Sequence, residues 1–107
     1  MKIEFNDKTF ENDVLKSEMA VLIDFWAPWC GPCRIQGPLV EELAKQFEGK
    51  NIKIGKMNVD ENIETAQKYN IMSIPTLILF KGGKPEKIFV GLRSKEELEK
   101  EIKKYIS

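Results

Sequence analysis

The chain has only two cysteines, and they follow directly on an apolar run with the character of a buried strand. The run covers residues 19–25, and the cysteines stand at positions 30 and 33 inside the segment WCGPC. A nearly continuous apolar run of this length is typical of a strand covered on both faces of its sheet. The apolar residues beyond the cysteines recur at helical spacing, so the thiols lie at a strand-to-helix junction. This junction favours an α/β fold built around one central strand.

The spacing of Cys30 and Cys33 favours redox chemistry over the other uses of paired cysteines. A structural zinc site needs four Cys or His ligands, and the chain has two cysteines and no histidine. Covalent haem attachment needs a histidine directly after the second cysteine, where this chain has Arg34. A structural disulfide is the remaining alternative, but a loop this short removes little entropy from the unfolded chain. We therefore interpret the pair as a dithiol that opens and closes.

Composition and charge narrow the other possibilities. The 107 residues fit one domain, residues 1–107, and carry 17 basic and 17 acidic side chains. This balance gives no reason to expect binding to nucleic acid or to an anionic membrane. The longest apolar run, residues 19–27, is interrupted by Asp24 and too short to cross a bilayer. Residues 1–7 lack the pattern of a secretory signal, so we expect a cytoplasmic protein.

Hydrophobic periodicity predicts the remaining elements around the central strand. Apolar runs predict strands at residues 3–5, 19–25, 52–59, 76–80 and 87–90. Helical spacing predicts helices at residues 10–15 with Thr9 as a possible cap, at 35–47 with Pro38 inside, at 64–69, and after the capping box of Ser94 and Glu97. Paired glycines between the last two strands favour a tight hairpin. The pattern indicates a mixed sheet between two layers of helices.

Residues 24–33, with the sequence DFWAPWCGPC, resemble the active-site segment of the thioredoxin family. The resemblance extends over essentially the whole chain, through the helix-kinking Pro38, the buried Lys56, the cis-proline loop at residues 74–76 and Gly91. It implies a central five-stranded mixed sheet, with strands in the spatial order 1-3-2-4-5, flanked by four helices. The chain departs from the common family pattern at Pro28 and at residues 36–37, a Gln-Gly pair where aliphatic or small residues are usual.

The two cysteines are expected to have different roles. Cys30 lies where the unpaired N–H groups of the helix favour a negative sulfur, so we expect it to be the nucleophile. Cys33 lies one turn further in, should be less exposed, and is positioned to resolve a mixed disulfide. Pro32 suits a first helical turn and, with Gly31, stiffens the spacing of the sulfurs and helps set the redox potential. Oxidising relatives usually have histidine in that dipeptide, so the Gly-Pro pair favours a reductase.

Asp24 and Lys56 are charged residues at positions that a simple core would leave apolar. Asp24 interrupts a buried strand, where an uncompensated carboxylate is costly. Strand alternation places Lys56 on the same face as Ile52 and Ile54. Two opposite charges in such places suggest an ion pair. It is either a structural pair or a site where Asp24 exchanges protons with Cys33, and the resemblance favours the second interpretation.

A surface for substrates is expected around Cys30. Trp26 is interpreted as core packing beneath the site, whereas Trp29 should be partly exposed as substrate-contact surface. The resemblance implies that the Ile74 backbone contacts an extended substrate peptide and that Pro75, after a cis bond, keeps its loop near the sulfurs. Met72, Ile74 and Gly91 would then form an apolar rim around the nucleophile.

The resemblance implies a thiol-disulfide oxidoreductase that reduces protein disulfides and is recharged by a thioredoxin reductase. It implies no metal and no cofactor beyond the Cys30–Cys33 disulfide, and we expect a monomer. An alternative is a binding module in which the fold serves as an adaptor and turnover is incidental. Whether the reductase uses NADPH or ferredoxin is open from the sequence.

Overall fold

Within residues 3–106, which the computed structural model describes, four strands form one mixed sheet in the order β2-β1-β3-β4. These strands are β1 (Ala20–Trp26), β2 (Ile52–Asn58), β3 (Thr76–Lys81) and β4 (Lys84–Val90). β1 pairs with β2 in parallel and with β3 in the antiparallel sense, so the apolar run is the central strand, as predicted. β3 and β4 form the predicted hairpin, with Gly82 and Gly83 at positive φ in its turn.

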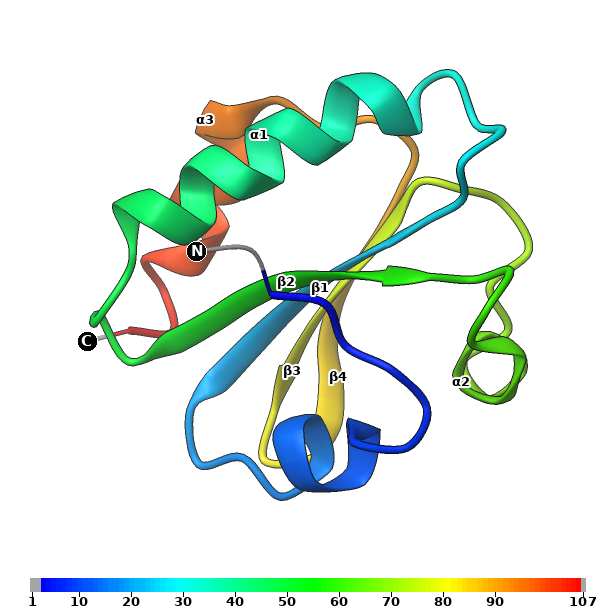
Figure 1. The fold of residues 1–107 in the computed structure, drawn as a ribbon. Coiled ribbons are helices and arrows are strands. Elements are labelled where there is room, and N and C mark those ends of the chain that lie inside the picture. The colour runs from blue at the N-terminus through cyan, green and yellow to red at the C-terminus, as the bar shows by residue number, and fades with distance from the viewer. Residues whose placement is uncertain (1–2, 107) are drawn as a thin grey trace.

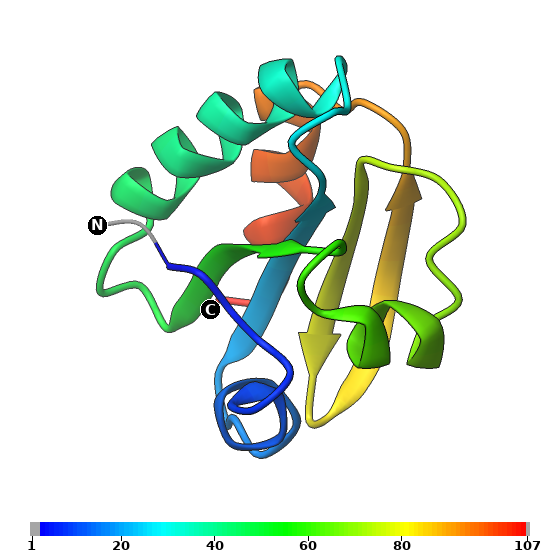
Figure 2. The ribbon, with the colours of Figure 1, turned by 45° about the vertical axis from the view of Figure 1, so that its right-hand side comes forward.

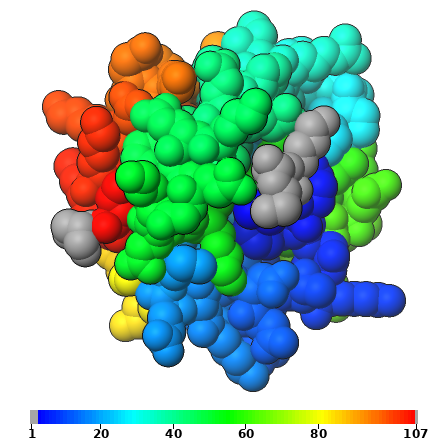
Figure 3. Space-filling model, turned by 60° about the vertical axis from the view of Figure 1, so that its left-hand side comes forward, coloured from blue at the N-terminus to red at the C-terminus, as the bar shows by residue number. Residues whose placement is uncertain are grey.

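The prediction of a fifth strand at residues 3–5 is wrong. Only Glu4 forms an isolated parallel bridge, opposite Lys56. The Phe5 N–H donates to the Lys56 carbonyl at 2.9 Å, and the Lys56 N–H donates to the Ile3 carbonyl at 2.9 Å. The chain then turns away from β2, because the side chain of Asn6 accepts the Thr9 N–H at 3.0 Å. The segment still lies at the predicted edge of the sheet, and Figure 3 shows this dark blue segment beside the green residues of β2 and α1.

Four helices are found in the described part of the chain, as predicted: η1 (Glu11–Leu15), α1 (Cys33–Gln46), α2 (Ile63–Lys68) and α3 (Lys95–Ile102). Thr9 does not cap the first of them, because its hydroxyl donates to the Asn6 side-chain oxygen at 3.3 Å and no side chain caps η1. Ser94 caps α3 as predicted, accepting the Glu97 N–H at 3.1 Å. Pro38 lies inside α1.

Alternate residues of the central strand face two separate cores. Ala20 and Leu22 pack with residues of α1 and α3, such as Leu43 and Leu98. The intervening residues of β1 pack on the opposite face, where η1 and α2 lie (Figures 1 and 2). By the same alternation Asp24 faces α1. The strand therefore delivers a carboxyl group beneath α1 just before the chain reaches the cysteines.

Candidate active site

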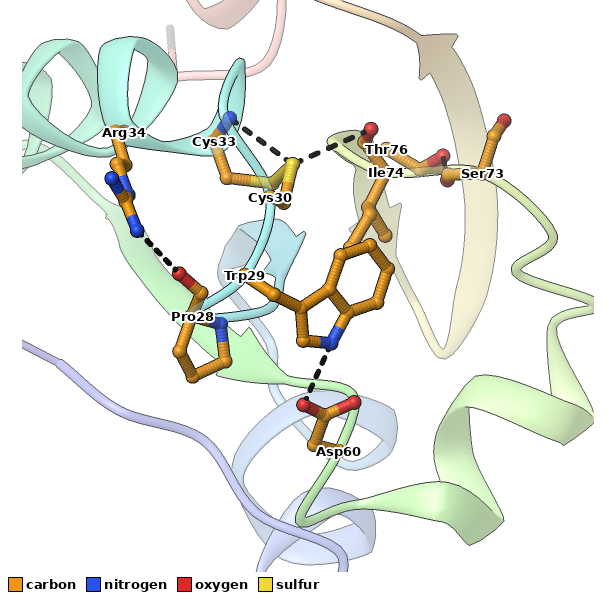
Figure 4. Close-up of a disulfide and its surroundings, with 9 residues drawn as sticks. All are labelled: Pro28, Trp29, Cys30, Cys33, Arg34, Asp60, Ser73, Ile74 and Thr76. Carbon is orange, nitrogen blue, oxygen red and sulfur yellow. Dashed lines mark hydrogen bonds between the residues drawn. A yellow bond between two sulfur atoms is a disulfide. The ribbon is translucent and has the colours of Figure 1, made fainter.

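Cys30 and Cys33 form a disulfide at the N-terminus of α1, with their Cα atoms 5.3 Å apart (Figure 4). Cys33 is the first residue of the helix, and Pro32 precedes it with helical angles, φ −59° and ψ −28°. The backbone N–H of Cys33 points at the sulfur of Cys30, at 3.2 Å. The first backbone donor of the helix thus faces Cys30, and it favours negative charge on the sulfur.

The two cysteines differ in what they face rather than in their exposure. Cys30 is 4% exposed and Cys33 is 5% exposed, so the prediction that Cys33 is the less exposed is wrong. A groove of about 480 Å³ nevertheless opens onto Cys30 and does not include Cys33. The tight turn through Gly31 and Pro32 brings Cys30 to the groove wall while α1 holds Cys33 behind it. A bulky partner can therefore reach the sulfur of Cys30 first.

The groove is lined without a charged side chain, although 32% of the chain is charged. Its lining residues are Trp29, Cys30, Gly31, Pro32, Val59, Ile71, Met72, Ser73 and Ile74. A second hollow, of about 350 Å³, adjoins it beside α2 and shares Val59, Ile71 and Met72. An uncharged surface of this kind suits apolar or extended polypeptide better than a charged ligand.

The cis-proline loop lies directly beside the disulfide. The bond between Ile74 and Pro75 is cis, as the resemblance implies. The Ile74 carbonyl oxygen is 3.7 Å from the sulfur of Cys30. The Gly91 N–H donates to the Pro75 carbonyl at 2.8 Å, and Gly91 has a φ of +96° that favours glycine. Ile74, Pro75 and Gly91 are thus brought together, although Gly91 does not line the groove.

Two exposed apolar side chains stand at the groove. Trp29 is 68% exposed and Met72 is 85% exposed, as expected of contact surface. The indole Nε1 of Trp29 donates to Asp60 at 2.9 Å, which fixes the ring across the groove wall (Figure 4). Asp60 was not among the sequence candidates, because its contact with Trp29 spans 31 positions and no local pattern indicates it.

Asp24 is fully buried, and neither of its carboxylate oxygens has a hydrogen-bond partner. Burial raises the pKa of Asp24 from 3.8 to about 7, while the nearby Lys56 lowers it and Glu4 raises it. A carboxyl group with this pKa exchanges its proton near neutral pH. Asp24 is therefore a buried carboxyl group that can take up or release a proton near neutral pH.

The predicted ion pair between Asp24 and Lys56 is absent, although the two residues are neighbours across β1 and β2. The ammonium group of Lys56 lies 3.2 Å from the Glu41 carboxylate on α1 and 4.8 Å from the centre of the Trp26 ring. The long side chain of Lys56 reaches the partly exposed carboxylate of Glu41, where its ammonium group loses less hydration than it would beside Asp24. Lys56 acts on Asp24 through its field rather than through contact.

No group of three or more His, Cys, Asp and Glu side chains in residues 3–106 could hold a metal ion. In the same residues, no helix combines the length and the apolar character that crossing a membrane requires.

Comparisons with known proteins agree with this geometry. The thioredoxin family model matches residues 1–104. A thioredoxin of Synechocystis sp. is 50% identical over 103 residues, covering 96% of this chain and 95% of its own length. A thioredoxin of Rickettsia bellii is 51% identical over 98 residues, covering 92% of each chain. The chloroplastic M-type thioredoxin of Pisum sativum is 48% identical over 101 residues, covering 94% of this chain and 58% of its own. With its disulfide at the N-terminus of α1, the chain therefore belongs to the thioredoxin family of thiol-disulfide oxidoreductases.

Proposed function

We propose that this protein reduces disulfides in other proteins, with Cys30 as the nucleophile and Cys33 as the resolving thiol. The observation that carries the proposal is the groove, which opens onto Cys30 and not onto Cys33. The disulfide joins the two residues, so Cys33 is within reach of any bond that Cys30 forms.

The reaction starts from the reduced protein. The thiolate of Cys30 attacks one sulfur of the substrate disulfide, and the other substrate sulfur leaves as a thiolate that takes up a proton. The product is a mixed disulfide between Cys30 and the substrate. The Cys33 N–H and the dipole of α1 favour the thiolate before the attack, and Gly31 with Pro32 tunes the redox potential by fixing this turn.

Cys33 then resolves the mixed disulfide. Asp24 takes the proton of Cys33, and the resulting thiolate attacks the sulfur of Cys30. The second substrate thiolate then leaves, the Cys30–Cys33 bond forms again, and two electrons have passed to the substrate. The burial of Asp24 and its pKa of about 7 support this role, and Lys56 keeps that pKa from rising further.

The substrate polypeptide is held along the groove. Trp29 and Met72 supply exposed apolar contact, and the backbone of Ile74 supplies hydrogen-bonding groups next to the attacked sulfur. Pro75 and Gly91 keep this loop against the dithiol through their own hydrogen bond. The absence of charged lining residues supports uncharged, extended segments as the preferred contact.

We also propose that a thioredoxin reductase recharges the protein. The protein works as a monomer and as one domain over residues 1–107, without binding nucleic acid or membrane.

Bacterial relatives matched over 92–95% of their own length support a cytoplasmic location. The chloroplastic relative supports a plastid location as the alternative. Purified NADPH-dependent and ferredoxin-dependent reductases, each supplied with the oxidised protein and a disulfide-bonded substrate, decide which donor recharges the protein. Turnover with neither reductase contradicts the recharging proposal.

A further inference from the structure

Gln36 is a fully buried amide one helical turn beyond Cys33, and its side chain holds the main chain of a distant loop. Its exposure is 0%. Its Nε2 donates to the Arg93 carbonyl oxygen at 3.1 Å, and its Oε1 accepts the Arg93 backbone N–H at 2.7 Å. One side chain thus satisfies both main-chain groups of a residue 57 positions away in sequence.

A buried amide is an unusual choice for this place in the fold. Val40 and Leu43, further along α1, fill the core without any polar group to satisfy. An amide in the same layer is costly unless both of its ends are paired. Gln36 meets that condition only while Arg93 stays where it is. The amide therefore specifies the position of the loop, which an aliphatic side chain would leave free.

The loop that Gln36 holds runs from β4 to α3 beside the first turn of α1 (Figures 1 and 2). Its first residue, Gly91, is bonded to the Pro75 carbonyl at 2.8 Å. Its third residue, Arg93, is fixed by the two hydrogen bonds to Gln36. Leu92 lies between these two anchors and is 44% exposed. An apolar side chain is thus presented on a short segment that is tied to the cis-proline loop at one end and to the redox helix at the other.

We propose that Gln36 is a positioning residue for protein substrates, holding Leu92 and the Gly91–Pro75 contact at a fixed place relative to the dithiol. This inference rests on the proposed reduction of protein disulfides. A loop that is already in place costs a bound polypeptide no ordering entropy, which strengthens binding. A small disulfide that touches only the sulfur of Cys30 gains nothing from the loop. Gln36 should therefore matter for one class of substrate and not for the other.

The test compares Gln36→Met with Gln46→Met. Met matches the length of the amide and lacks its donor and acceptor. Gln46 lies on the same helix, is exposed, and donates to Glu99 far along the chain, so it controls for the loss of a glutamine from α1. Gln36→Met should raise KM for a disulfide-bonded protein about fivefold, the factor for one net hydrogen bond. Its kcat, and its rate with a small aromatic disulfide, should change less than twofold, and Gln46→Met should leave all three within twofold.

Hydrogen exchange and a second variant separate positioning from a general loss of structure. The Arg93 amide should exchange faster in Gln36→Met, because its acceptor is gone, while amides in β1 keep their rates. Leu92→Ser alters an exposed side chain and should raise the same KM two- to fivefold by removing part of the apolar contact. If Gln36 acts through Leu92, the double variant should be no worse than Gln36→Met alone.

Different results would overturn the positioning role of Gln36 and the proposed function. An unchanged KM in Gln36→Met, equal losses with protein and small disulfides, or additive effects in the double variant would each overturn the positioning role. If Gln36→Met does not fold, an unchanged KM in Leu92→Ser overturns the role of the loop. Failure of the wild-type protein to reduce any protein disulfide refutes the proposed function itself, whereas an active wild type with an equally active Gln36→Met refutes only this inference.

Discussion

The groove beside Cys30 and the layer between β1 and α1 are neighbouring regions with opposite chemistry. The groove is exposed and uncharged, with Trp29 and Met72 at its rim. The inner layer contains the carboxyl group of Asp24 without a hydrogen-bond partner, and the ammonium group of Lys56 near it. In the proposed reaction, recognition takes place at the groove and proton transfer in the buried layer, on separate sides of one disulfide. Variants of each region should therefore change different measured quantities.

The largest effect is expected from the cysteines themselves. Cys33→Ser should accumulate a covalent complex with substrate proteins, because the attack by Cys30 survives and resolution does not. Cys30→Ser should trap none, since the groove does not reach Cys33. Non-reducing gels after mixing each variant with a disulfide-bonded protein give the comparison. Trapping by Cys30→Ser alone would reverse the roles that the groove assigns.

The buried carboxyl group of Asp24 should make the stability of the protein depend on pH. The pKa of Asp24 is raised from 3.8 to about 7, so between these values the folded protein binds a proton that the unfolded chain has lost. The cost of Asp24 to stability is thus absent below about pH 4, grows as the pH rises, and is complete above about pH 7. Asp24→Asn should raise the free energy of unfolding by about 2–4 kcal/mol at pH 8 and by less than about 1 kcal/mol at pH 4.

Chemical denaturation of the oxidised protein at both pH values measures this difference. A variant that is destabilised at pH 8 would mean that Lys56 compensates the Asp24 carboxylate much better than the lack of a hydrogen bond between them indicates.

A charge placed in the groove should lower the affinity for protein substrates. Met72→Glu places a charge in an uncharged groove, and it should raise KM for protein disulfides about five- to tenfold, the cost of desolvating a charge without a partner at a partly exposed site. Ile88→Glu is a matched control, because Ile88 is also an exposed apolar residue but lies on β4 outside the groove. Steady-state kinetics of both variants measure the two KM values. Equal increases in KM would show that the groove is not the contact surface.

The smallest expected effect concerns Lys56. Lys56→Met removes the cation that lowers the pKa of Asp24, so that pKa should rise further. The pH at which resolution reaches half its maximal rate should then move upward, with KM little changed. Stopped-flow measurement of disulfide formation between pH 6 and 9 follows the shift. A midpoint that moves downward would contradict the sign of the interaction.

Much of the site could be predicted from the sequence because its main parts are local. The strand, the WCGPC turn and the helix are consecutive, so the position of Cys30 at a helix N-terminus follows from order alone. The prediction of a fifth strand was wrong for a local reason too. Residues 3–5 are followed at once by the Asn6 turn, and they form only one bridge. The choice of partner by Lys56 could not be predicted, because a long side chain on the correct face reaches either Asp24 or Glu41.

Contacts between residues far apart in the sequence could not be predicted either. The sequence indicated that Gln36 is unusual but not what it does, because Arg93 is 57 positions away. The bond from Trp29 to Asp60 was missed for the same reason.

The separation of the two regions is tested most directly by the pH profile of single-turnover reduction of a protein disulfide by wild type, Asp24→Asn and Met72→Glu. The wild type should show a midpoint near pH 7, where Asp24 loses its proton. Asp24→Asn should lose that midpoint and keep the substrate concentration for half-saturation, whereas Met72→Glu should keep the midpoint and need more substrate. A midpoint near pH 7 that persists in Asp24→Asn, or one that moves in Met72→Glu, would contradict the assignment of proton transfer and recognition to separate sides of the disulfide.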